Sequence, residues 1–361
     1  MEVYELSLDG TVKKISALPD GVRLVCAFGC FDGVHLGHRA LLSAAVEKAE
    51  KLNRLCEISA SAKRGAEECC GEGASSICDV RSERRDCGAV YASAVWTFSE
   101  PVSRPWIISV AERLSLCGSL GIRYAICQRF ENVRTLSPEE FIDSMVAQGL
   151  CHGVCGYNFR FGYKGAGEPE RLRKCLNASL ARNGCLDGAL GEDTVTVVGR
   201  VCALGDAVSS TRIRAVLADG GMEETAALLG RPYSLSGTIL SGKQIGRTIS
   251  RPTANLIYSP DQLVPKRGVY FTYCRVKGNV YRAVTNVGYR PTVNSDVDSV
   301  TCEAHLLDFS DSVYGECAEI IFVHYHREER AFSSVEELSV QINHDVEAAI
   351  GYFDAREREN V

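Results

Sequence analysis

The sequence lacks both a long apolar run and an excess of positive charge. No stretch approaches the ~18 apolar residues of a membrane-spanning helix, so we expect no membrane partner. The first residues show no cationic start followed by an apolar core, which argues against a signal peptide and favours a cytoplasmic protein. The formal net charge is −6, whereas general nucleic-acid binders carry a basic excess. We therefore expect no nucleic acid partner.

Residues 56–92 show no clear periodicity and are rich in Ser, Gly, Glu, Arg and Cys. This composition predicts an insertion or a long loop. This stretch has no Cys-x-x-Cys pair and no His, so we assign no zinc site to it. The chain has 17 cysteines, and in the absence of an export signal we interpret them as reduced thiols. Its 361 residues are enough for two domains.

A Gly-rich turn follows the apolar residues 22–27, and helical spacing of apolar residues follows the turn. Gly29 and Gly33 allow a bound group to approach the backbone closely. His35 and His38 lie on one face of the helix start, where free N–H groups attract an anion and both imidazoles can donate to phosphoryl oxygens. The alternative is that one His merely caps or packs locally. The pattern is Gly29-x-Phe31-Asp32-Gly33-x-His35-x-Gly37-His38.

The rest of the first half alternates strand and helix signals, which predicts a parallel sheet. The expected strands are residues 94–98, 124–127, 153–155 and 194–198, and the expected helices are residues 109–120 and 137–149. Asn158 lies in a Gly-flanked segment after one of these strands, where open α/β sheets bind ligands. Ser209, Ser210 and Thr211 with Arg214 are typical of a helix N-terminus, but they also suit an anion clamp.

From about residue 230 the periodicity becomes alternating, which predicts a second, all-β domain built as a small closed barrel. The expected strands are residues 269–276, 280–287, 300–309 and 319–325. A final helix is expected from Ser334 to about Tyr352, with Leu338, Ile342, Val346 and Ile350 facing the barrel. We therefore expect domains at residues 1–229, with the insertion 56–92, and at residues 230–361.

A second group of candidate residues lies in the β-rich half. Gly242, Lys243, Gly246 and Arg247 form a Gly-punctuated cationic loop that suits a polyphosphate. Thr253 and Asn255 lie two residues apart, so an extended chain places both oxygens on one side, which suits Mg²⁺. Glu303 is a carboxylate inside a β-forming run, where a solvent-facing side chain is the usual outcome.

These motifs occur in the order seen in the bacterial bifunctional riboflavin kinase/FAD synthetase family, which the chain resembles over nearly its whole length except residues 56–92. The resemblance implies a nucleotidylyltransferase domain with a Rossmann-like parallel sheet, followed by a riboflavin kinase barrel with a terminal helix. It implies riboflavin, FMN, FAD and ATP as partners and Mg²⁺ as a cofactor, and it leaves weak self-association open.

The resemblance also implies residue roles. Glu303 becomes the base for the ribityl hydroxyl, and His35, His38 and Arg214 become catalytic in adenylyl transfer. Thr253 and Asn255 become metal ligands. Nucleotide contacts carry over to Gly29, Phe31, Asp32, Gly33, His35, His38, Asn158, Ser209, Ser210, Thr211, Arg214, Gly242, Lys243, Gly246 and Arg247. Flavin contacts carry over to Asn158, Asn286, Gly288, Arg290 and Glu303.

Two segments depart from the family pattern. The usual Thr-Phe-Asp-Pro-His-Pro is Thr97-Phe-Ser-Glu-Pro-Val102 here, and the usual Gly-Phe before Pro-Thr-Ala-Asn is Ser250-Arg251. One alternative is therefore a riboflavin kinase with an impaired adenylyltransferase half, and another is a flavin-binding protein without turnover. A tRNA synthetase also uses a His-x-Gly-His turn, but the chain has no Lys-Met-Ser-Lys-Ser loop.

Overall fold

The computed structural model describes residues 1–6, 11–69, 89–184, 193–240, 253–290, 299–309, 311 and 313–359. The chain forms two compact units, one made of Met1–Ser103 with Val110–Cys202 and the other of Arg104–Ser109 with Ala203–Val361. The domain boundary expected after residue 229 stays a prediction. None of the helices in the described ranges has the length and hydropathy needed to cross a membrane.

The first unit is organised around a sheet with the strand order β2-β1-β5-β4-β3-β6-β7. Its strands are β1 (Glu2–Leu6), β2 (Val12–Ile15), β3 (Val22–Phe28), β4 (Val90–Phe98), β5 (Tyr124–Gln128), β6 (Leu150–Gly156) and β7 (Val195–Val198). Strands β5, β4, β3, β6 and β7 are parallel, and β1 and β2 add an antiparallel edge. The predicted parallel sheet is confirmed, and its order reverses between β3 and β6, where such sheets bind ligands.

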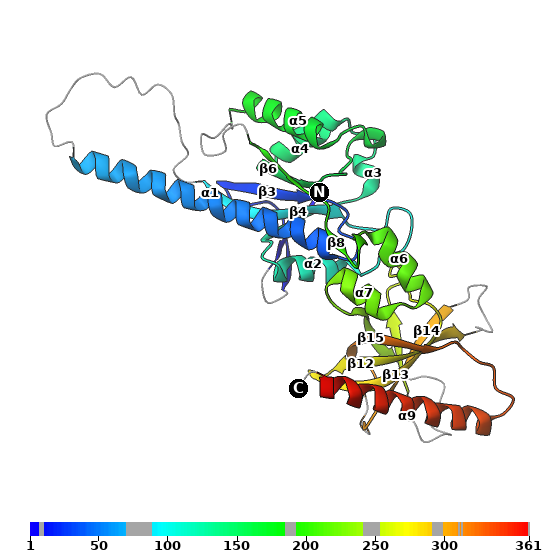
Figure 1. Cartoon of the computed structure of the whole chain (residues 1–361). Helices are drawn as coiled ribbons and strands as arrows, with labels where there is room; N and C mark the ends of the chain where they lie inside the picture. Colours follow the sequence, from blue (N-terminus) through cyan, green and yellow to red (C-terminus); the bar gives the residue numbers. More distant parts are fainter. Residues whose placement is uncertain are drawn as a thin grey trace. The chain divides into compact units, whose positions relative to one another are not determined.

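Helices cover both faces of this sheet, with α1 and α2 on one face and α4 and α5 on the other (Figure 1). The helical elements are α1 (Leu36–Cys69), α2 (Val110–Ser119), α3 (Phe130–Val133), α4 (Pro138–Val146), the 3₁₀ turn η1 (Tyr163–Gly165) and α5 (Pro169–Arg182). Ser137 caps α4 and Glu140 bonds back to Ser137, so a capping box opens the helix that was expected to begin here. Buried Phe28, Trp96 and Phe141 form an aromatic cluster in the core.

The expected loss of regular structure from Cys56 was wrong up to Cys69, because α1 continues to that residue. Leu55 and Ile58 are 40% and 66% exposed, so burial does not explain this extension. Residues 53–69 are instead rich in good helix formers, and adding a residue to an existing helix costs little. Residues 70–88 lie outside the described part of the chain.

The second unit contains a closed antiparallel barrel with the strand order β10-β11-β14-β13-β12-β15, which confirms the predicted barrel. Its strands are β10 (Tyr233–Leu240), β11 (Thr253–Tyr258), β12 (Gly268–Val276), β13 (Asn279–Arg290), β14 (Ser299–Leu306) and β15 (Cys317–Arg327). Short strands β8 (Cys202–Ala203) and β9 (Asp206–Ala207) pair with each other.

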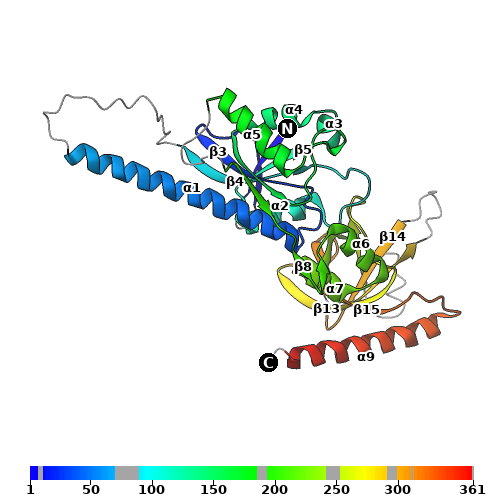
Figure 2. The same cartoon turned by 45° about the horizontal axis from the view of Figure 1, so that its top comes forward.

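Three helices accompany the barrel: α6 (Ser210–Asp219), α7 (Met222–Leu229) and α9 (Val335–Glu359). Figure 2 shows α6 and α7 on the opposite side of the barrel from α9. Ala349 and Phe353 of α9 are buried against Phe271 of β12. The expectation that Ile350 faces the barrel was wrong, because Ile350 is 40% exposed and Ala349 takes that position.

Candidate functional site

The turn between β3 and α1 has an unusual backbone. Phe31 and Val34 have φ angles of 51° and 41°, although neither is glycine, and Gly33 has a φ of 87°. Such conformations cost energy and persist where surrounding contacts enforce them, as they often do at functional sites. The Val34 amide donates to the Phe31 carbonyl at 3.1 Å, which closes the turn two residues before α1 begins at Leu36.

The two predicted imidazoles lie face to face in this turn. The rings of His35 and His38 are stacked, with centroids 3.6 Å apart and an angle of 14° between planes. The His38 amide donates to His35 Nδ1 at 3.3 Å, so a neutral His35 carries its proton on Nε2. Burial, the His35 ring and the Arg113 charge hold the pKa of His38 well below its usual range. At neutral pH His38 is therefore an uncharged hydrogen-bond donor rather than a cation.

Asn158 lies at the same edge of the sheet as this turn. It follows β6, which pairs with β3, and both strands end at the point where the strand order reverses. The Phe28 and Phe159 rings pack with centroids 5.9 Å apart, which ties the two strand ends together. Asn158 is exposed, so its amide is accessible to a ligand. The structure therefore brings Gly29–His38 and Asn158 to adjacent strand ends.

The segment Ser209–Arg214 belongs to the other compact unit. The Ser209 hydroxyl accepts from the Arg212 amide at 3.2 Å, so Ser209 is the N-cap of α6. This agrees with the expectation that these residues form a helix N-terminus. Ser210 and Thr211 form the first turn of that helix. Arg214 donates through Nη2 to the Pro105 carbonyl at 2.6 Å. The phosphate-binding role of these residues stays a prediction.

Three of the predicted residues of the barrel are neighbours on adjacent strands. Glu303 on β14 is in register with Asn255 on β11 and with Asn286 on β13. Residues paired in this way project to the same face of a sheet. All three are partly exposed, while Ala254, Cys302 and Val287 beside them are buried inside the barrel. A carboxylate therefore lies between two amides on the outer face of the barrel.

The Asn255 side chain suits a metal ligand. Its Oδ1 atom is buried and accepts no hydrogen bond from the described residues, which leaves an oxygen that a hard cation can use. Thr253 is in register with His305, two positions along the same strand pair. The expected contacts at Gly242, Lys243, Gly246 and Arg247, the departure Ser250-Arg251 and the side chains of Thr253 and Arg290 lie outside the described residues.

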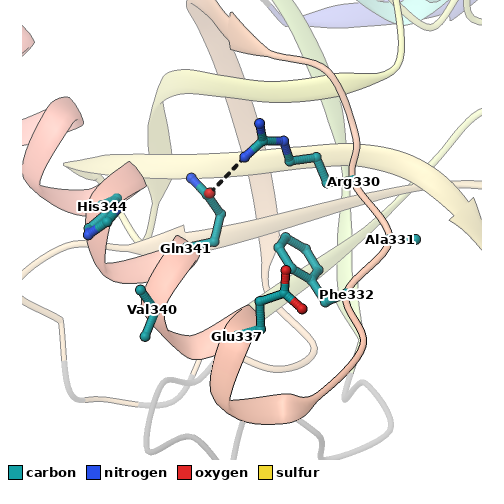
Figure 3. A pocket seen from close by; sticks show the side chains of 7 residues that line it. All are labelled: Arg330, Ala331, Phe332, Glu337, Val340, Gln341 and His344. Atoms are coloured by element: carbon teal, nitrogen blue, oxygen red, sulfur yellow. Dashed lines mark hydrogen bonds between the residues drawn. The ribbon is translucent and has the colours of Figure 1, made fainter.

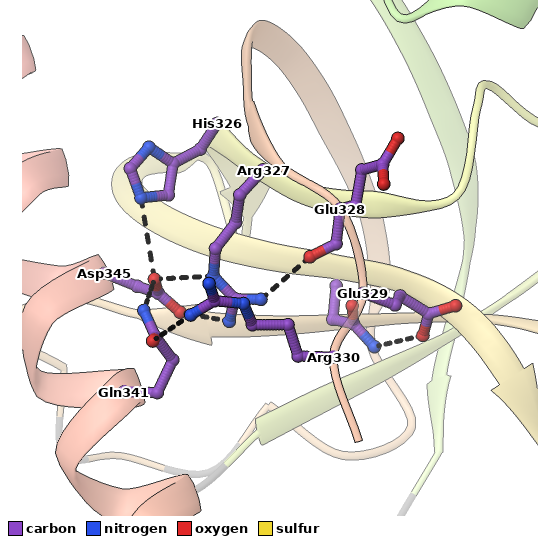
Figure 4. A network of polar contacts seen from close by, with 8 residues as sticks. His326, Arg327, Glu328, Glu329, Arg330, Gln341 and Asp345 are labelled. Carbon is purple, nitrogen blue, oxygen red and sulfur yellow. Dashed lines mark hydrogen bonds and ion pairs between the residues drawn. The ribbon is translucent and has the colours of Figure 1, made fainter. Parts of the chain in front are cut away.

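Sequence reasoning missed a second carboxylate beside this row. Asn286 Nδ2 donates to Glu329 Oε1 at 3.4 Å, and Glu329 is labelled in Figure 4. Gly288 lies under the same carboxylate, because a Cβ at that position would be 2.0 Å from Glu329 Oε1. Glu329 follows β15 in an exposed polar segment, where periodicity carries no functional signal. A glycine at position 288 thus leaves the space that the Glu329 carboxylate occupies.

An ion pair fixes the segment that carries Glu329. Arg327 donates to both carboxylate oxygens of Asp345 on α9, at 2.8 and 2.7 Å (Figure 4). Asp345 is only 2% exposed and also accepts from Gln341 at 2.9 Å. Burial raises the pKa of Asp345, but the hydrogen bonds from Arg327 and Gln341 outweigh burial and leave the pKa below its usual range. The α9 helix is therefore tied to the end of β15.

A pocket lies directly beyond this ion pair. It is formed by the segment after β15 and by one side of α9 (Figure 3). Its lining residues are Arg330, Ala331, Phe332, Glu337, Val340, Gln341 and His344. Phe332 and Val340 offer apolar surface, while Arg330 and Gln341 are bonded to each other at 3.2 Å. The pocket thus combines an aromatic wall with hydrogen-bonding groups.

The two units have the features of a transferase that handles nucleotides. The first has a doubly wound sheet with a strained His-x-Gly-His turn at its switch point. The second has a small barrel with a carboxylate flanked by amides. The FAD synthetase family pattern matches residues 19–60 and 93–212, and the riboflavin kinase pattern matches residues 229–353.

The chain belongs to the bifunctional riboflavin kinase/FMN adenylyltransferase family. The protein of that name from Listeria monocytogenes is 30% identical over 343 residues, which cover 92% of this chain and 93% of the relative. The one from Bacillus subtilis is 30% identical over 332 residues, covering 91% and 92%. A crystal structure titled as a macrolide-efflux protein from Streptococcus pneumoniae has the same fold, with a TM-score of 0.68, 24% identity and coverage of 92% and 95%.

Proposed function

We propose that this chain phosphorylates riboflavin to FMN and then adenylylates FMN to FAD, using one ATP in each step. We assign the kinase reaction to residues 230–361 and the adenylyl transfer to residues 1–229. Two arrangements of the predicted residues support the proposal. Glu303 lies between two amides on the barrel, and the stacked imidazoles lie at the sheet's switch point.

In the kinase step Glu303 accepts the proton of the flavin's terminal ribityl hydroxyl. The hydroxyl oxygen forms a bond to the γ-phosphorus of ATP, the bond from that phosphorus to the bridging oxygen breaks, and ADP leaves. Asn286 holds the hydroxyl-bearing chain beside Glu303, because the two are in register. The loop Gly242–Arg247 covers the phosphates. The aromatic pocket wall formed by Phe332, three residues after Glu329 in the chain, suits the flavin ring.

The buried Asn255 Oδ1, which accepts no hydrogen bond from the described residues, supports a Mg²⁺ site. Thr253 and the buried Asn255 Oδ1 would hold it, and the ion would neutralise phosphate charge during transfer.

In the adenylyl step an oxygen of the FMN phosphate attacks the α-phosphorus of ATP, and pyrophosphate leaves. No protein nucleophile is required, so positioning and charge stabilisation supply the rate. The imidazoles of His35 and His38 donate hydrogen bonds to the phosphates, and the N-terminus of α1 adds its positive dipole end. Ser209, Ser210, Thr211 and Arg214 bind further phosphate oxygens, and Asn158 binds nucleotide or flavin.

A kinase with an impaired adenylyltransferase half is the second candidate. Glu100 occupies the altered segment 97–102 and forms an ion pair with Arg129 at 3.1 Å. The segment nevertheless keeps one contact with the turn, because the Thr97 hydroxyl donates to the Cys30 carbonyl at 3.0 Å. The backbone geometry of the site thus remains compatible with adenylyl transfer.

One experiment separates these possibilities. Purified protein is incubated with Mg²⁺ and ATP, together with either riboflavin or FMN, and the flavins are separated by chromatography. We expect FAD from both incubations. FMN as the sole product from riboflavin, with no FAD from FMN, would establish the kinase alone. No FMN or FAD from riboflavin, together with no FAD from FMN, would refute the enzyme and leave a flavin-binding protein.

A further inference from the structure

Arg113 is a buried cation directly behind the nucleotide turn. It lies on α2 and is 1% exposed, which makes it one of the largest fully buried side chains among the described residues. Burying a guanidinium is expensive unless hydrogen bonds compensate for its lost hydration. A purely apolar residue would fill the same space at lower cost. The presence of arginine therefore calls for an explanation in terms of what the charge and its donors do.

Its guanidinium joins the ends of two adjacent parallel strands. Nη1 donates to the Cys30 carbonyl at 2.8 Å, and Nη2 donates to the Phe98 carbonyl at 2.7 Å. Cys30 lies in the turn Gly29–His38 that follows β3, whereas Phe98 is the last residue of β4 and lies in the altered segment 97–102. One rigid fork thus sets the spacing between the two loops.

The Cys30 carbonyl is held from two sides, since it also accepts from the Thr97 hydroxyl at 3.0 Å. In a trans peptide the carbonyl and the following N–H point in opposite directions. Fixing this carbonyl therefore fixes the Phe31 amide on the other side of the turn. Phe31 is the first of the turn's left-handed residues, so this peptide is where the strained backbone begins.

The charge of Arg113 also reaches the His38 imidazole and the Asp32 carboxylate of the turn. It acts on His38, where it favours the uncharged ring, and it interacts with Asp32 in the turn. A cation beneath an anion-binding turn adds to the field of the α1 N-terminus. Neither contact requires Arg113 to touch the nucleotide.

We propose that Arg113 is a positioning residue for adenylyl transfer, because it fixes the Cys30 carbonyl and the strained turn that carries His35 and His38. This inference rests on the proposed adenylyltransferase activity. The proposal also explains how the turn keeps its geometry although the neighbouring segment lacks the family's aspartate and histidine.

The test compares Arg113→Met, Arg113→Lys and Arg173→Met in the full chain. Arg173 is a matched control, because it also joins a helix to a strand of the same unit by donating to the Val195 carbonyl at 3.0 Å. That strand, β7, is separated from β4 by β3 and β6 in the sheet. We expect Arg113→Met to lower the kcat of FAD formation from FMN by ~100-fold and Arg113→Lys by ~10-fold. Arg173→Met should change it less than about twofold. Conversion of riboflavin to FMN should be unchanged in all three.

A readout without catalysis keeps the inference testable if Arg113→Met is unstable or if wild type makes no FAD. Amide hydrogen exchange at Gly29, Val34 and His38, which donate hydrogen bonds in the turn, should be faster in both Arg113 variants than in wild type and Arg173→Met. Unchanged exchange, or equal loss of FAD formation in Arg113→Met and Arg173→Met, would overturn the inference. Absence of FAD formation by wild type refutes the proposed function instead.

Discussion

The two candidate sites are built on opposite kinds of backbone. The first is a single irregular turn, Gly29–His38, in which non-glycine residues adopt left-handed conformations. The second is spread over β11, β14 and β13, and the strand register alone brings Asn255, Glu303 and Asn286 together. Ladder hydrogen bonds hold the backbone of the second site, whereas the first depends on groups behind it. Substitution of the residues that hold the turn should therefore impair the first site. The second site should be impaired mainly by substitution of its own side chains.

The sharpest test of the strand site is Glu303→Gln. The amide keeps the size and register of the side chain but cannot accept the ribityl proton, so we expect kcat for FMN formation to fall ~1000-fold. FAD formation from FMN should stay unchanged, and measuring both reactions in one preparation gives the control. Glu319→Gln on β15 is a matched variant that should leave both rates unchanged, since Glu319 pairs with Arg275. A Glu303→Gln enzyme with the wild-type rate would remove Glu303 from the mechanism.

The corresponding test of the turn site is His38→Ala. It removes one ring of the stacked pair and one donor to the phosphates, so we expect ~100-fold slower FAD formation from FMN. FMN formation from riboflavin should be unaffected. Loss of both activities would instead indicate general unfolding, which a thermal melt of the same sample detects.

The support of the strand site is tested by Asp345→Asn. It leaves the buried end of Arg327 without a counter-charge, and we expect the second unit to lose about 2–3 kcal/mol at pH 7 in urea unfolding. Because the pKa of Asp345 is lower in the folded state, its contribution is complete above the unfolded carboxyl pKa and is lost as pH falls through the folded value. The two stability curves should therefore converge in acid. Glu357→Gln, which removes an exposed partner of Arg282, should cost less than about 1 kcal/mol.

The same contrast explains what could be predicted from the sequence. The turn was predictable because the residues of its motif are contiguous, and the parallel sheet and the barrel followed from periodicity. Glu303 could be singled out, but its pairing with Asn255 and Asn286 could not, since register depends on strand ends and turns. The burial of Arg113 and Asp345 could not be predicted, because a charged residue inside a helical pattern normally faces solvent. The extension of α1 was not predicted, because it depends on the helix propensity of its residues and not on a stripe of apolar side chains.

The smallest expected effect comes from Gly288→Ala, which probes the strand site through space rather than chemistry. A Cβ at Gly288 would lie 2.0 Å from Glu329 Oε1, so the carboxylate must move away and its bond from Asn286 is lost. We expect kcat/KM for riboflavin to be roughly tenfold lower, with little change in the rate of FAD formation from FMN. Gly351→Ala on α9 is the control, since a Cβ there meets nothing within 4 Å. Equal kcat/KM for the two variants would mean that Glu329 does not shape the flavin site, and the row Asn255–Glu303–Asn286 would then be sufficient by itself.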